Sequence, residues 1–128
     1  MLVVNGTIKT YLSYNKTPEI AKKRLVQILN FCNENKIEPT LVTTLVTYVY
    51  NELVTKDIYE ERIYKHIDDV LSKIDFPVQY LDYSRYEPIS NNLDYFFDAD
   101  HLILTGVKKF TDTLLKNINV KLLEGENI

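Results

Sequence analysis

The chain has 128 residues, a formal net charge of −3 and a pI near 5.4. This length fits one domain with a hydrophobic core and is too short for two domains of ordinary size. Hydrophobic residues make up 45% of the chain and charged residues 26%, which excludes a disordered, collagenous or coiled-coil protein. Phosphate binding needs a concentrated basic face, so we expect no nucleic-acid partner.

Missing residue patterns exclude several further classes. Cys32 is the only cysteine, so an intrachain disulfide and a zinc site with several thiolates are excluded, and we expect Cys32 to be a small buried hydrophobe. Three glycines, with neither GxGxxG nor GxxxxGK[ST], argue against a nucleotide-binding loop, and we expect no cofactor. Apolar runs stay far below the roughly 20 residues of a membrane-spanning helix, and no secretory signal is recognisable. The sequence predicts no membrane span, and as the chain stands the protein is expected to be either cytoplasmic or without its targeting segment.

The first half of the chain predicts a hairpin, a helix and a strand. Asn5-Gly6 lies between β-forming residues, so residues 1–14 are predicted to form a hairpin or an extended segment. Residues 18–35 are predicted to form a helix that follows the cap residue Thr17. The β-branched run at residues 39–46 predicts a buried strand, with a tyrosine-rich loop after it. The apolar side of the predicted helix contains Ile20, Leu25, Ile28, Leu29 and Cys32.

The second half continues the alternation of helices and strands. A helix is predicted from residue 54 or 56 to residue 74, a strand at 76–82, a polar and aromatic loop at 84–100 and a last helix at 103–118. This order predicts an α/β fold with helices packed on a small parallel sheet. Two parallel strands are too few to stand alone, so we expect further strands from the N-terminal segment, a partner or residues outside the chain.

The sequence holds one chemical pattern, Phe96-Phe97-Asp98-Ala99-Asp100-His101-Leu102, which follows a predicted parallel strand. Loops at this end of a strand are where functional groups of α/β folds gather. Asp98 lies three residues before His101, so the two side chains can meet within one turn. The carboxylate then fixes the tautomer of the imidazole and stabilises the imidazolium that forms when it takes a proton. Asp98 and His101 are therefore the candidate catalytic residues.

This pattern resembles the C-terminal part of SGNH (GDSL-like) hydrolases and acyltransferases, whose last block reads Asp-x-x-His, commonly with Leu next and then a Gly and a Phe in the closing helix. The resemblance implies one domain over residues 1–128, built as a partial flavodoxin-like three-layer sandwich. It also implies serine-esterase or O-acyltransferase chemistry on an acyl ester, such as one carried by a carbohydrate, with His101 as general base and Asp98 as its orienting group. The matching residues here are Asp98, His101, Leu102, Gly106 and Phe110.

The Gly-Asp-Ser block that carries the nucleophile of this family does not occur in these residues, nor do its Gly and Asn blocks for the oxyanion hole. We therefore predict that the isolated chain is inactive unless a separately supplied N-terminal half or a second copy completes the site. The alternative function is a non-catalytic remnant that works as an interaction or assembly module through a sheet edge and apolar surface. A third interpretation is an unrelated small α/β binding domain in which the His101 block only caps a helix.

Each candidate residue also has a plain structural explanation. Asp98 and Asp100 suit the capping of the last helix. Because acidic clusters are usually solvated loops, a metal site is the weaker alternative. Its ligands would be Asp94, Asp98, Asp100 and His101.

Ser84, Ser90 and His66 are expected to have structural roles or none, whereas the aromatic residues around the loop leave two interpretations open. Ser84 and Ser90 share the loop before His101 but are more typical of turn formers than of nucleophiles. His66 is expected to face solvent without a role. An aromatic group around the loop is either a packed lid over the sheet end or the wall of an acyl or sugar pocket. Its members are Tyr80, Tyr83, Tyr86, Tyr95, Phe96 and Phe97.

Overall fold

The computed structural model describes residues 19–118, so the predicted hairpin or extended segment at 1–14 and the cap residue Thr17 lie outside the described part. The elements in chain order are α2 (Glu19–Glu34), β1 (Thr40–Thr43), α3 (Tyr48–Leu53), α4 (Lys56–Tyr59), a π-helical turn (Glu60–Tyr64), α5 (Lys65–Ser72), β2 (Gln79–Asp82), α6 (Glu87–Ser90), a 3₁₀ turn (Leu93–Tyr95) and α7 (Leu104–Asn117).

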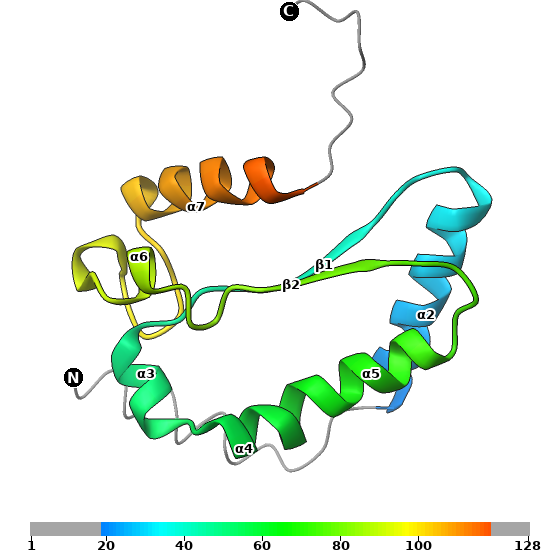
Figure 1. Ribbon diagram of the computed structural model, residues 1–128, viewed down its shortest axis with the longest axis horizontal. Coiled ribbons are helices and arrows are strands. Elements are labelled where there is room, and N and C mark those ends of the chain that lie inside the picture. Colours follow the sequence, from blue (N-terminus) through cyan, green and yellow to red (C-terminus); the bar gives the residue numbers. More distant parts are fainter. Residues whose placement is uncertain (1–18, 119–128) are drawn as a thin grey trace, which may run out of the picture.

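The two strands form a small parallel sheet, which confirms the predicted α/β class at its coarse level. Thr40 pairs with Gln79 and Thr43 pairs with Asp82. In Figure 1, α6 and α7 lie on one side of the strands, and α4 and α5 lie on the other. Within residues 19–118, each strand keeps one edge that pairs with no further strand. None of the helices in this range combines the length and the apolar composition needed to cross a bilayer.

Two clusters of buried side chains form the core. Val54, Tyr59 and Ala99 form one cluster. Leu45, Tyr83 and Ile89 form the other. Ala99 belongs to the Asp98–His101 block, so the core reaches directly beneath the candidate site. Partly buried side chains from the strands, the loop and α7 pack on the second cluster, namely Val42, Leu81, Tyr86, Tyr95, Phe96, Leu102, Phe110 and Leu114.

A short helix, α3, replaces most of the predicted tyrosine-rich loop. Its N-cap is Thr47, whose hydroxyl accepts a hydrogen bond from the Tyr50 amide at 3.2 Å. Thr47 is buried, and its own amide donates to the carbonyl of Ala99 at 2.9 Å. The predicted loop is wrong here, because the cap residue and its tertiary contact decide the local structure.

The helix predicted from residue 54 or 56 to 74 is confirmed, with a π-helical turn between α4 and α5. In a π turn the hydrogen bonds close between residues five apart. Tyr59 and Tyr64, five residues apart, stack with their ring centroids 5.8 Å apart and their planes at 23°. The Tyr64 hydroxyl also donates a hydrogen bond to the carboxylate of Asp82. The turn therefore connects the long helix to the end of β2.

Helix α2 follows the predicted range closely, but its predicted apolar side is only partly covered. Leu29 is 1% exposed, whereas Ile20 and Ile28 are 60% and 56% exposed. Cys32 is only partly buried, although the sequence predicts a buried side chain. Among the described elements α2 packs mainly on α5, and one neighbouring helix covers only a narrow stripe of a helix surface.

Candidate active site

Residues 95–103 form a short antiparallel hairpin that carries the predicted catalytic residues at its tip. Phe96 and Leu102 form an antiparallel bridge, and the Phe97 amide donates to the His101 carbonyl at 2.7 Å. Phe96 and Leu102 pack on the core. Because successive side chains of a strand point to opposite sides, Phe97 and His101 share the outer face of the hairpin.

Asp98 binds both the backbone of the turn and the imidazole. Its Oδ1 accepts hydrogen bonds from the amides of Asp100 and His101 at 3.1 and 2.9 Å. Its two carboxylate oxygens lie 2.9 and 3.0 Å from Nδ1 of His101. The structure thus brings together the two residues that the sequence selects.

Asp100 is a second carboxylate beside the same ring nitrogen, with Oδ1 3.1 Å from Nδ1 of His101. The side chains of Asp98 and Asp100 are 20% and 18% exposed, whereas that of His101 is 69% exposed. The sequence assigns Asp100 only a capping or metal-binding role. The only signal in the sequence for the contact of Asp100 with His101 is the spacing of the two aspartates before the histidine. This signal is weak, because the contact depends on the geometry of the turn.

The charges of the turn favour an ionised Asp–His pair. The hydrogen bond to Asp98 raises the pKa of His101, and the charge of Asp100 raises it further. Desolvation alone would raise the pKa of Asp98, but the hydrogen bonds from the Asp100 amide and from His101 bring it below its usual value. Since Nδ1 faces the carboxylates, Nε2 is the ring nitrogen that remains for another group, and no hydrogen bond within residues 19–118 engages it.

Helix capping does not explain the acidic residues of the turn, so this alternative is wrong. The N-cap of α7 is Ile103, and no side chain makes a capping hydrogen bond there. Asp98 instead accepts its hydrogen bonds from Asp100 and His101, inside the turn. The helix begins too late in the chain for Asp98 or Asp100 to occupy its N-cap position.

The same three side chains are the residues that could hold a metal ion. Asp98, Asp100 and His101 each offer one ligand atom, and these atoms lie within 4.8 Å of one another. Asp94, the fourth residue of the predicted cluster, is not part of this group. Nδ1, the imidazole nitrogen that faces the two aspartates, already lies within hydrogen-bond distance of their carboxylates. The contacts are therefore accounted for by an Asp–His pair without an ion.

The serines of the described residues do not supply an accessible hydroxyl near the imidazole. Ser84 is 0% exposed and Ser90 is 2% exposed. Ser72 lies at the end of α5 and donates to the carbonyl of Asp69 at 2.7 Å. No hydrogen bond in residues 19–118 joins any of these serines to His101.

Polar contacts that the sequence did not reveal anchor the loop after β2. The side-chain amide of Asn51 donates to the Ser84 carbonyl at 2.8 Å. Arg85 donates to the Val54 carbonyl at 3.0 Å, and its guanidinium carbon lies 5.2 Å from the centre of the Tyr59 ring. These bonds tie the start of the loop to α3 and α4. No spacing rule could have found them, because the partners are more than twenty-five residues apart.

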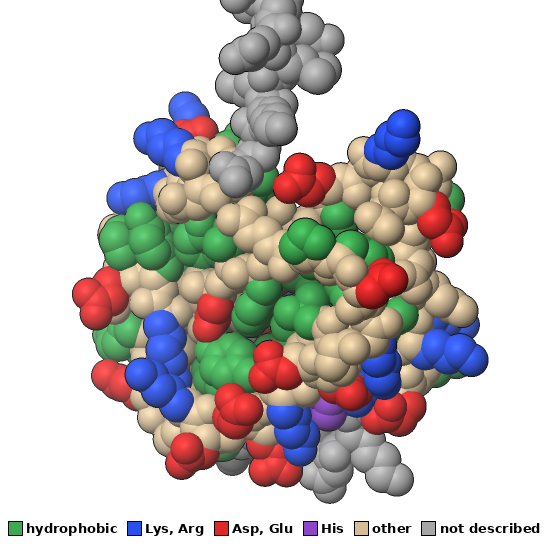
Figure 2. Space-filling model, turned by 45° about the vertical axis from the view of Figure 1, so that its right-hand side comes forward, with side chains coloured by type: hydrophobic (Ala, Val, Ile, Leu, Met, Phe, Trp, Pro, Cys, Tyr) green, Lys and Arg blue, Asp and Glu red, His purple; other side chains and the backbone are tan. Residues whose placement is uncertain are grey.

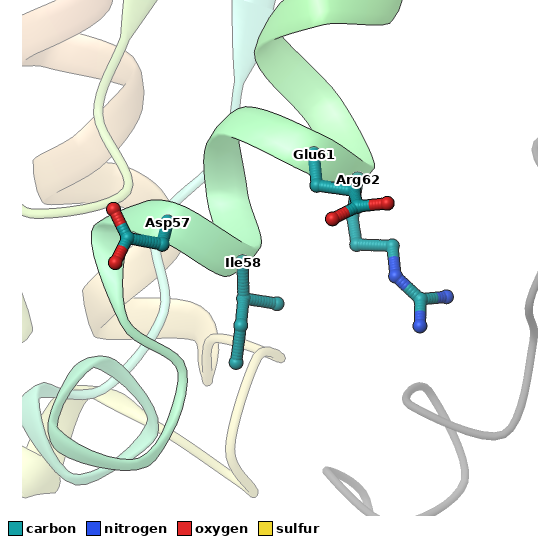
Figure 3. A pocket seen from close by; sticks show the side chains of 4 residues that line it. All are labelled: Asp57, Ile58, Glu61 and Arg62. Carbon is teal, nitrogen blue, oxygen red and sulfur yellow. The ribbon is translucent and has the colours of Figure 1, made fainter.

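Two other features lie away from the hairpin. His66 on α5 is partly buried, although the sequence predicts that it faces solvent. A pocket of about 390 Å³ is lined by Asp57, Ile58, Glu61 and Arg62. Figure 3 shows these side chains projecting from α4 and the π-helical turn. None of them belongs to the hairpin, so the candidate site is an exposed turn and not this pocket.

Comparison with known proteins gives the chain no family. No protein-family model matches it, and no match was found among curated proteins or among solved structures. The geometry of the hairpin and the sequence pattern within it are therefore the features that bear on function.

Proposed function

We propose that this chain is the C-terminal part of a serine esterase or O-acyltransferase of the SGNH type, with a partial flavodoxin-like three-layer fold. His101 acts as the general base, and Asp98 orients it. The observation that carries the proposal is the contact of Nδ1 with both Asp98 oxygens, at 2.9 and 3.0 Å, on an imidazole that is 69% exposed. A ring that is held at Nδ1 and open at Nε2 suits the base of a serine hydrolase.

The place of the hairpin in the fold supports this function. It follows β2 in the chain, and the carboxyl ends of parallel strands are where functional groups of α/β folds gather. The apolar members of the sequence pattern have packing roles. Gly106 is buried in α7, and the ring of Phe110 meets that of Tyr83 edge-on at 5.3 Å between centroids. The closing helix thus packs on the core and leaves the polar members of the pattern outside.

In the proposed reaction, Nε2 of His101 removes the proton from a serine hydroxyl as the oxygen attacks the ester carbonyl. The bond from the serine oxygen to carbon forms, the bond from carbon to the alcohol oxygen breaks, and the alcohol takes the proton from Nε2. The acyl group then passes to water in an esterase or to a second hydroxyl in an acyltransferase. Asp98 stabilises the imidazolium that exists between the two proton transfers, and the charge of Asp100 adds to this effect.

The proposal places the nucleophile outside residues 19–118. Ser84 and Ser90 are buried, and Ser72 is bound at the end of α5. The serine then belongs to another part of this chain, to a second copy or to a separately supplied N-terminal half. The small sheet supports this, because two strands are marginal by themselves and further strands would bring a nucleophile loop to the same edge.

The test is covalent trapping of the nucleophile in the natively assembled protein. The tagged chain is purified from its own host with the polypeptides that hold it, treated with a fluorophosphonate, and analysed by intact mass. We expect one labelled serine per chain in the wild type and in the control His66→Ala, slower labelling in Asp98→Asn and none in His101→Ala. A folded assembly without a labelled serine, or labelling that survives His101→Ala, contradicts the proposal.

The second candidate function is an interaction or assembly module without catalysis. The observation that favours it is the exposure of large apolar side chains, since Phe97 is 81% exposed and Leu104 83%. Figure 2 shows hydrophobic side chains gathered in the middle of one face of the molecule, with charged side chains around them. Under this alternative, the purified assembly contains no phosphonylated serine and stays intact in His101→Ala.

A further inference from the structure

We propose that Phe97 binds the alcohol part of the ester substrate, and that this alcohol is uncharged and carries a ring with an apolar face. The inference rests on the proposed function, because it concerns the substrate of the same site. The inference names Phe97 as a residue that determines specificity. It also names the chemical class of the alcohol that leaves.

The first step is the pairing of Phe97 with His101. The Phe97 amide donates to the His101 carbonyl at 2.7 Å, so the two residues face each other across the hairpin. The Cβ atoms of residues paired in this way lie about 4.5–5.5 Å apart. The neighbouring pair, Phe96 and Leu102, packs on the core. Phe97 is 81% exposed, the side chain of His101 is 69% exposed, and the alternation of the hairpin directs the Cβ atoms of both residues to the same face.

The second step is that Phe97 has no packing role among the described residues. It belongs to neither buried cluster and packs on neither, unlike Phe96 directly before it. A single exposed apolar residue is ordinary on a protein surface. Phe97 differs from such a residue because it lies opposite His101, the proposed general base, and can therefore contact the substrate.

The third step comes from the path of the proton. His101 must give its proton to the departing oxygen, so the alcohol has to lie within hydrogen-bond reach of Nε2. The alcohol therefore occupies the side of the reacting carbon that faces the imidazole, and the acyl group lies on the far side. Phe97 shares the outer face with His101 and is the aromatic side chain that the alcohol meets there.

The fourth step defines the class of alcohol. A phenylalanine ring binds another flat apolar face through dispersion and edge or face contacts. The carboxylates of Asp98 and Asp100 lie on the other side of the imidazole and disfavour a negatively charged alcohol. An aryl group and the C–H face of a sugar ring share the required chemistry.

The experiment compares two phosphonates that carry the same phosphonyl group and differ in what leaves. In both, the bond from the serine oxygen to phosphorus forms and the serine proton moves to Nε2 of His101. Fluoride leaves from one reagent and p-nitrophenoxide from the other, so only the second places a ring on the leaving side. Labelling rates are measured in the purified assembly, with Phe31→Ala as the control because Phe31 is an exposed phenylalanine on α2.

We expect Phe97→Ala to slow labelling by the p-nitrophenyl phosphonate about three- to tenfold and to leave labelling by the fluorophosphonate unchanged. Phe97→Tyr is expected to keep the wild-type rates, and Phe31→Ala to change neither. Equal slowing with both reagents, or no slowing with either, overturns the inference while the proposed function stands. Absence of labelling by both reagents in the wild type overturns the proposed function and this inference with it.

Two further measurements identify the ring and exclude a protein partner at Phe97. Benzyl alcohol and methyl β-D-glucopyranoside are each tested for protection against fluorophosphonate labelling. Protection by either, weaker in Phe97→Ala, supports the inference and names an aryl or a sugar ring, and protection by neither overturns it. Sedimentation of Phe97→Ala is expected to give the wild-type mass, and dissociation of the assembly would assign Phe97 to an interface instead.

Discussion

The two faces of the 95–103 hairpin differ in how far their side chains are buried. Phe96 packs on the core, whereas Phe97, the next residue, is 81% exposed. Leu102 packs beside Phe96, whereas the side chain of His101 is 69% exposed. The alternation of a strand thus separates packed side chains from exposed ones within two residues, so a change on one face is expected to leave the other face intact.

The largest effect is expected beneath the inner face. Ile89 is 0% exposed and belongs to the cluster on which Phe96 and Leu102 pack. Ile89→Ala is expected to lower the free energy of unfolding by about 2–5 kcal/mol, because it leaves a cavity in this cluster. Urea unfolding measures the loss. Phe97→Ala is the outer-face control and is expected to change the stability by less than about 0.5 kcal/mol; losses of similar size in both variants would break the comparison.

A smaller loss of stability is expected at the junction of the hairpin and α7. A Cβ atom at Gly106 would meet the backbone oxygen of Tyr95, which also accepts the amide of Ile103 at 2.9 Å. Alanine normally stabilises a helix relative to glycine, but here the clash decides the sign, and we expect Gly106→Ala to cost about 1–3 kcal/mol. The thermal midpoint is the measurement, and exposed Thr105→Ala is the control. A stabilised Gly106→Ala variant would show that the hairpin moves freely against α7.

On the outer face, the expected effect is on titration more than on stability. Asp98→Asn removes the hydrogen bond that contributes most to the raised pKa of His101, so this pKa is expected to fall. The imidazole resonances of His101 and His66, followed against pH, measure the change. Asp94→Asn, which alters an exposed carboxylate of the same loop, is expected to leave both histidines unchanged. An unaltered His101 in Asp98→Asn would refute the pairing.

The same pair also makes a small contribution to stability that depends on pH. Its full contribution is expected between pH 3.8 and 6.5, the ordinary values of the two groups. Above this window it is lost as the pH rises through the raised pKa of His101, and below it as the pH falls through the lowered pKa of Asp98. The difference in urea midpoint between wild type and Asp98→Asn is therefore expected to be largest inside the window. A difference that grows above pH 8 would contradict this sign.

The smallest effect is expected for the second carboxylate. Asp100 places one oxygen 3.1 Å from Nδ1 of His101, whereas Asp98 places two at 2.9 and 3.0 Å. Asp100→Asn is therefore expected to lower the pKa of His101 by less than Asp98→Asn does, in the same titration. The reverse order would make Asp100 the orienting group and would move the proposed role from Asp98 to its neighbour.

The two histidines show why the residue type alone does not identify a base. Desolvation lowers the pKa of His66, and the charges of Lys22 and Lys65 lower it further. The pKa of His101 is raised by the hydrogen bond to Asp98 and by the charge of Asp100. A histidine among cations is a weak proton acceptor at neutral pH, whereas one against carboxylates takes up a proton readily.

The sequence predicted the elements that follow from periodicity and missed those that depend on distant contacts. The helices α2, α5 and α7 and both strands lie within the predicted ranges, since each has a regular apolar pattern. The short helix α3 was missed because its cap residue, Thr47, is fixed by the carbonyl of Ala99, more than fifty residues later. The exposure of Ile20 and Ile28 was also missed, because a pattern shows which side is apolar but not whether a neighbour covers it.

In the candidate site, too, the sequence predicted the local contact and missed the feature that depends on packing. The three-residue spacing of Asp98 and His101 was sufficient to predict their contact, because it is local. The hairpin that places Phe97 opposite His101 has no Asn-Gly or Gly-Gly turn, so the sequence indicated only a loop there. A local pair can be derived from spacing, whereas the face on which it lies depends on the packing of the residues between.

The π-helical turn between α4 and α5 contains one residue more than a turn of regular α-helix needs. Tyr59 and Tyr64 stack across it, and Tyr64 reaches Asp82. Removing one residue from the turn would leave the two tyrosines four residues apart in a regular α-helix, where they would still share a face. A deletion of one residue within 60–64 is therefore expected to keep the direction of α5, whereas the same deletion inside α5 would rotate the residues after it by about 100°.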